Sequence, residues 1–128
     1  MKYRSITINE ELPARLVKFL TGAFASKEVK FGDVKPLIIE AESLKNELAA
    51  FEKSGLIKQI LFERPFQWVL DVPDEPKLYD FYKFVLLIDN ALVRLFRAYH
   101  MQQIDESEMK KLRLKIISLV DQSKAELR

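Results

Sequence analysis

The chain begins with an alternating segment that leads into a helical pattern. Ile6 and Ile8 alternate with polar residues, which predicts a short half-buried strand. From Asn9, a residue type that often caps helices, apolar residues recur at helical spacing over about residues 10–25. A second, very short alternation predicts a strand over residues 28–31.

The next pattern predicts either one long helix or two shorter ones. After Asp33, apolar residues follow a spacing of three and four: Val34, Leu37, Ala41, Leu44, Leu48 and Phe51. Gly55 is placed to end this element with a left-handed residue. The pattern alone leaves open whether residues 34–53 form one helix of about 20 residues or a helix pair.

Two apolar runs then predict a β-hairpin. Residues 57–62 and 66–72 flank a loop formed by Glu63, Arg64 and Pro65. In the second run the large apolar side chains alternate with polar ones, so that one face of the strand is apolar.

The C-terminal half reads as two helices. Pro76 begins an apolar helical pattern over about residues 77–101, and its stripe is wide enough to require burial on two sides. The last helix, residues 106–126, has the clearest start in the chain, with Asp105 as N-cap and Glu108 at the third position. We expect these two helices to form a dimerisation extension.

Length and composition agree with one α+β domain over residues 1–128. With 128 residues, 48% of them apolar, the chain supports one hydrophobic core. The expected fold is a small sheet or hairpin with helices, followed by the two-helix extension.

Composition removes most enzyme classes. There is no cysteine, one histidine and only three glycines, which excludes thiol chemistry, Cys/His metal sites and Gly-rich phosphate loops. We therefore expect no enzymatic activity, no cofactor and no metal. The N-terminus lacks an export signal and no apolar run is long enough to cross a membrane, so we expect a cytoplasmic protein.

His100 is the sharpest catalytic candidate. Its spacing from Arg94 resembles the Arg-x(4–6)-His motif of HEPN ribonucleases, although Leu95 stands where that family usually has a polar residue. The simpler interpretation is a histidine near a helix C-terminus, where the helix dipole favours its charged form. The basic run Lys110, Lys111, Arg113 and Lys115 is likewise either a phosphate-binding surface or a solvated helix face.

Residues 44–57 read LKNELAAFEKSGLI, and they follow a helix and a short strand and precede the predicted hairpin. This order and this segment resemble the recognition helix and wing entry of winged-helix transcription regulators, over about residues 10–72. The resemblance implies a DNA-binding regulator, with Ser43, Lys45 and Asn46 near the major groove and Lys58 and Arg64 on the wing. DNA and a second copy of the chain are the implied partners.

Two alternatives stay open. Residues 2–12 resemble the strand and first helix of ribbon–helix–helix proteins, which bind DNA through strands paired between two chains. Residues 33–54 carry five acidic residues and three basic ones, which favours a protein-binding surface over a phosphate-binding one. The alternative function is therefore that of a small interaction or assembly protein, which uses its apolar helices to bind a protein partner and does not bind nucleic acid.

Overall fold

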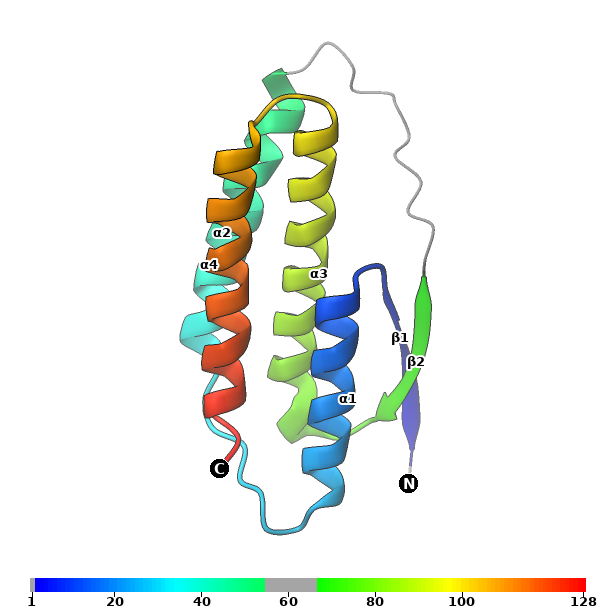
Figure 1. Ribbon diagram of the computed structural model, residues 1–128. Coiled ribbons are helices and arrows are strands. Elements are labelled where there is room, and N and C mark those ends of the chain that lie inside the picture. Colours follow the sequence, from blue (N-terminus) through cyan, green and yellow to red (C-terminus); the bar gives the residue numbers. More distant parts are fainter. Residues whose placement is uncertain (1, 55–66) are drawn as a thin grey trace.

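The computed structural model describes residues 2–54 and 67–128, with side chains for 2–51 and 67–128. Its elements follow in the order β1 (Tyr3–Ile8), α1 (Glu11–Ala25), α2 (Lys35–Ser54), β2 (Trp68–Pro73), the 3-10 turn η1 (Pro76–Leu78), α3 (Tyr79–His100) and α4 (Glu106–Ala125) (Figure 1). The predicted α+β class is confirmed, with four helices and a two-stranded antiparallel sheet among the described residues.

Helix α3 forms the centre of the fold. It contacts α1, α2 and α4, which lie around it, and its buried side chains include Phe81, Phe84 and Ile88. Figure 1 shows α2 and α3 running in the same direction and α4 running back. The wide apolar stripe predicted for this helix is thus covered on several sides by the same chain, while dimerisation through residues 77–127 stays a prediction.

The sheet pairs the two ends of the N-terminal half. Strand β1 runs antiparallel to β2, with Ile6 opposite Leu70, and the buried Ile6 and Ile8 confirm the predicted half-buried strand. The predicted hairpin partner of β2, residues 57–62, lies outside the described residues. Because β1 pairs with a strand of its own chain, the structure does not show the inter-chain strand pair that the ribbon–helix–helix alternative implies.

The N-cap of helix α1 lies one residue later than predicted. Glu10, not Asn9, is the N-cap, and its side chain makes no capping hydrogen bond. Asp89 of α3 binds the residues just before the helix: its Oδ1 accepts from the backbone N–H groups of Asn9 and Glu10, both at 2.9 Å, and its Oδ2 accepts from the Asn9 side-chain amide at 2.9 Å. A buried side chain 80 positions away thus holds the segment that leads into α1.

Residues 35–54 form one continuous helix, which settles the open alternative in favour of a single helix. Leu37, Ala41, Leu44 and Leu48 form its buried face. A winged-helix arrangement requires a turn between two helices in this part of the chain, and the structure shows no such turn within residues 35–54. The winged-helix topology is therefore not shown.

Two shorter predictions have different outcomes. The predicted strand over residues 28–31 is wrong apart from Phe31, which forms an isolated antiparallel bridge with Leu127 near the C-terminus. The start of α4 is confirmed, because Asp105 is its N-cap and accepts a hydrogen bond from the Glu108 backbone N–H at 2.8 Å.

Tyr82 leads to a prediction about alkaline stability. Its hydroxyl is buried and donates to the Pro73 carbonyl at 2.8 Å, and burial raises its pKa from 10.0 to about 12. Below pH 10 the phenol is protonated in both the folded and the unfolded chain, whereas between pH 10 and 12 only the unfolded chain ionises. The contribution of Tyr82 to stability is therefore present below pH 10 and lost as the pH rises through 12.

We expect Tyr82→Phe to cost about 1 kcal/mol at neutral pH, because the hydrogen bond to Pro73 is lost. The same variant is expected to show a smaller loss of stability than the native chain above pH 10. Urea unfolding at pH 7, 10 and 11 measures both effects. The exposed Tyr3→Phe is the control, and an equal alkaline slope in the native chain and Tyr82→Phe would contradict the assignment.

Candidate functional site

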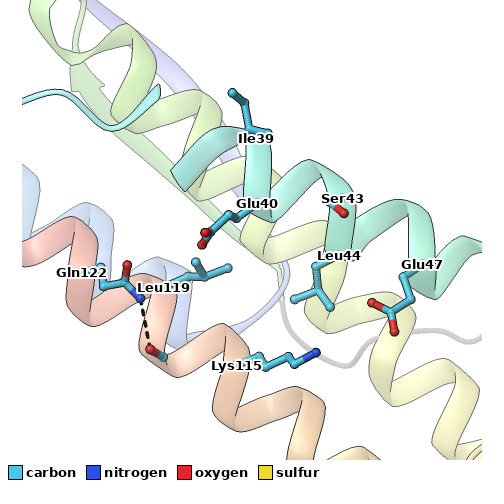
Figure 2. Close-up of a pocket in the computed structure, with 9 residues that line it drawn as sticks. Ile39, Glu40, Ser43, Leu44, Glu47, Lys115, Leu119 and Gln122 are labelled. Carbon is cyan, nitrogen blue, oxygen red and sulfur yellow. Dashed lines mark hydrogen bonds between the residues drawn. The ribbon is translucent and has the colours of Figure 1, made fainter. Parts of the chain in front are cut away.

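A groove between α2 and α4 is one of the concave surfaces of the described chain, and it is lined by both helices. Its volume is about 510 Å³, and it is lined by Ile39, Glu40, Ser43, Leu44, Glu47, Lys115, Ser118, Leu119 and Gln122. Leu44 and Leu119 are buried and form an apolar floor. We call this surface the α2–α4 groove (Figure 2).

The helix period explains why the groove has this lining. Leu44 and Leu48 are four residues apart and face the core, so the residues between them turn toward α4 or solvent. Figure 2 shows Glu40 and Glu47 directed toward α4, and Lys115 of α4 directed into the groove. One side of the groove is acidic and the other is basic.

Over the described residues no ion pair joins the two sides of the groove. Lys110 of α4 pairs with Glu106, and Arg15 of α1 pairs with Glu11, each across one helical turn. On the basic side, Gln122 Nε2 donates to Ser118 Oγ at 3.2 Å. In the described part of the chain Glu47 and Lys115 therefore remain available to charged groups of a partner.

Two large aliphatic side chains near the groove face solvent. Ile39 on α2 is 69% exposed and Leu114 on α4 is 65% exposed. Each lies on the outer face of its helix, since Leu114 is two residues from both Leu112 and Ile116, which are buried. Single exposed aliphatic residues are ordinary, but these two lie on the helices that form the groove.

The predicted DNA-contact residues are only partly brought together. Ser43 and Asn46 are exposed three positions apart on α2, and Ser43 lines the groove. Lys45 is half-buried and leaves the helix about 200° from Ser43, at 100° per residue. Lys58 and Arg64, the predicted wing residues, lie outside the described residues.

The exposed face around Ser43 is acidic. Glu40, Glu42 and Glu47 are all exposed on α2, whereas the bases Lys110, Lys111, Arg113 and Lys115 are exposed on α4. Phosphates bind where cations collect, so the local charge on α2 is unfavourable for DNA.

The Arg94 and His100 side chains do not converge within one chain. Both belong to the uninterrupted helix α3, on which six positions correspond to a rotation of about 240°. The Arg94 Nε donates to Asn90 Oδ1 at 2.6 Å, and the His100 ring contacts the Tyr99 ring edge-on. His100 is the last residue of α3, which agrees with the simpler interpretation of a histidine at a helix end. It also lines a hollow at the turn between α3 and α4.

Comparisons with protein-family models, curated proteins and solved structures found no match for this chain. Over residues 2–54 and 67–128, no three His, Asp or Glu side chains are grouped so as to hold a metal ion. None of the helices in that part of the chain has the length and apolar character needed to span a bilayer.

Sequence reasoning missed most of the groove. Glu40, Lys115, Leu119 and Gln122 come from helices about 75 positions apart, and no local pattern relates them. The available signals were Ile39 and Leu114, large apolar residues out of phase with the buried positions of their helices.

Proposed function

We propose that this protein is a non-enzymatic interaction protein whose α2–α4 groove binds a helical surface of a protein partner. The observation that carries the proposal is the groove itself, with an apolar floor, one acidic and one basic side, and exposed aliphatic residues on both helices. Amphipathic helices bind in such grooves through an apolar stripe, while flanking charges select the partner and its direction.

Binding of DNA through α2, as the winged-helix resemblance implies, stays a prediction. It receives less support, because the exposed Glu40, Glu42 and Glu47 outnumber the exposed Lys35 among the described residues of α2, and Lys45 does not share a face with Ser43. If α2 does bind duplex DNA, affinity falls steeply with salt, and Lys45→Glu combined with Arg64→Glu abolishes it. Under the proposed function, no saturable duplex binding occurs even at low salt.

The proposed function is tested with a synthetic amphipathic helix. The probe is a 20-residue peptide with leucines at helical spacing, lysines along one flank and glutamates along the other. Added to ¹⁵N-labelled protein at a concentration where the protein is monomeric, it is expected to shift the amide signals of Ile39, Leu44 and Leu119 in a saturable manner. The signals of Phe19 and Tyr79, which are exposed on other helices, should not move.

A matched pair of variants locates the binding. Ser43→Arg places a bulky side chain in the groove and is expected to weaken peptide binding at least about tenfold, the equivalent of roughly 1.4 kcal/mol. Asn46→Arg makes the same kind of change on an exposed residue that does not line the groove, and should leave binding unchanged. Absence of saturable shifts, or equal effects of the two variants, would count against the proposed function.

A further inference from the structure

We infer that the occupant of the α2–α4 groove is a second copy of this chain, arranged so that α2 of each protomer lies on α4 of the other. The inference rests on the proposed function, since it uses the same groove, and it names the partner. It follows from the distribution of charge over the two helices and from their direction and length.

Two symmetric arrangements bring this face of one copy against the same face of a second copy, and the charges on the face favour one of them. A two-fold axis parallel to the helices puts α2 on the partner's α4, whereas an axis across them puts α2 on α2 and α4 on α4. On the side of α2 that lines the groove the charged residues are Glu40 and Glu47. On the side of α4 that lines it the charged residue is Lys115, with the exposed Lys111 one turn away. The parallel axis therefore joins opposite charges, and the crossed axis would join like ones.

The heights of the charged residues fit the parallel axis. Glu47 and Lys115 line the same groove from opposite sides (Figure 2), and a rotation about an axis parallel to the helices preserves height along them. Glu47 of one protomer thus meets Lys115 of the partner subunit, and the same contact occurs a second time by symmetry. Ser43 and Ser118 have small side chains, which allow the helices to approach closely.

The size of the face is adequate for a dimer. Helices α2 and α4 each have 20 residues and are about 30 Å long. Side by side, two helices roughly 10 Å wide present about 600 Å², near the roughly 800 Å² that each partner buries in an ordinary stable interface. Ile39 and Leu114, which are exposed in the single chain, become buried in this contact, and their burial stabilises the dimer.

Analytical ultracentrifugation of the full chain tests the inference. The native protein is expected to show a concentration-dependent dimer that weakens as salt is raised, because dissolved ions screen the attraction between the paired charges. Glu47→Lys alone and Lys115→Glu alone should each raise the dimer dissociation constant at least about tenfold, because each replaces two attractive contacts by two repulsive ones.

Mixing the two variants separates this arrangement from any effect within one chain. In a heterodimer of Glu47→Lys with Lys115→Glu, both symmetric contacts again join opposite charges, so an equimolar mixture should recover the native dissociation constant to within about threefold. Glu28→Lys and Lys18→Glu make the same charge changes at exposed positions outside the groove, and should leave the dimer unchanged. Circular dichroism verifies that all variants are folded.

Several results would overturn the inference: a monomer at all concentrations, single variants that dimerise like the native chain, or a mixture that fails to recover. A monomeric chain that still binds the amphipathic peptide overturns the second copy as partner and leaves the proposed function standing. A monomeric chain that does not bind the peptide overturns both.

Discussion

Phe84→Ala is expected to lower the free energy of unfolding by about 3–5 kcal/mol. Phe84 is fully buried on α3, the helix that α1, α2 and α4 all contact. The substitution removes the apolar area of an aromatic ring from the core and leaves a cavity that the surrounding helices can fill only in part. Urea unfolding followed by circular dichroism measures the change.

Leu86→Ala on the same helix is the control. Leu86 is 40% exposed, and its truncation should cost less than about 1 kcal/mol. Since a domain of this size is stable by only about 5–15 kcal/mol, the Phe84 variant should be visibly less stable at 37 °C. Equal costs for the two variants would mean that α3 is not the centre of the core.

Asp89→Ala is expected to cost on the order of 4 kcal/mol, because it removes hydrogen bonds to a charged acceptor and leaves backbone donors of Asn9 and Glu10 buried without it. Asp89→Asn should cost less. Its remaining oxygen can still accept from the two backbone N–H groups that Oδ1 serves, although the new amide faces the Asn9 side chain.

The unfolding free energies of the two Asp89 variants are compared with that of Asp80→Ala, which removes a carboxylate from the first turn of the same helix. This control should cost less than about 1 kcal/mol, through the helix dipole alone. Hydrogen exchange of the first turn of α1 adds a local measurement, because it should accelerate in Asp89→Ala. If the Asp89 variants cost as little as Asp80→Ala, the hydrogen bonds of Asp89 to Asn9 and Glu10 do not stabilise the start of α1.

Helices were predictable because their signals are local. The apolar spacing over residues 10–25 and 77–101 and the Asp105 cap each lie within one element, and each is found in the structure within a few residues. The single helix over residues 35–54 was one of two alternatives that the same periodicity allowed. Helix periodicity does not reveal a break when both halves keep the same phase.

Long-range partners were not predictable from the sequence. The expected hairpin pairing of β2 with residues 57–62 lies outside the described residues, and no sequence pattern indicated the pairing with β1, whose residues lie 60 to 70 positions earlier. The contact of Asp89 with the start of α1 was unpredictable for the same reason, since tertiary packing brings this side chain to the backbone N–H groups of Asn9 and Glu10. These contacts depend on how α3 packs, and no spacing rule within either segment encodes them.

The candidate site was likewise predictable only where its residues are close together in the sequence. The sequence directed attention to Ser43, Lys45 and Asn46, and the helix period places only the first and third of these on a common exposed face. Ser43 belongs to the groove, but the opposite side of the groove comes from α4, where the basic run had a solvated face as its simpler interpretation. Because α2 and α4 are neighbours, Lys115 of that run lies across the groove from Glu40 and Glu47.

The packing of α3 bears on where a second chain can bind. Its apolar residues are covered within the chain by α1, α2 and α4, so much of its stripe is already buried. The outer faces of α2 and α4 keep Ile39 and Leu114 exposed and carry opposite charges. A self-complementary contact through these faces accounts for both features.

Carbodiimide coupling of the native chain tests the proposed contact most directly, because it joins carboxylates to amines only when they touch. An equimolar mixture of ¹⁵N-labelled and unlabelled protein is treated, the covalent dimer is isolated, and its peptides are analysed by mass spectrometry. We predict a cross-linked pair of peptides joined through Glu47 and Lys115, in which one peptide is ¹⁵N-labelled and the other is unlabelled. A covalent dimer without that mixed-isotope pair, or a Glu47–Lys115 link found only between peptides of the same isotope, would contradict the proposed interface.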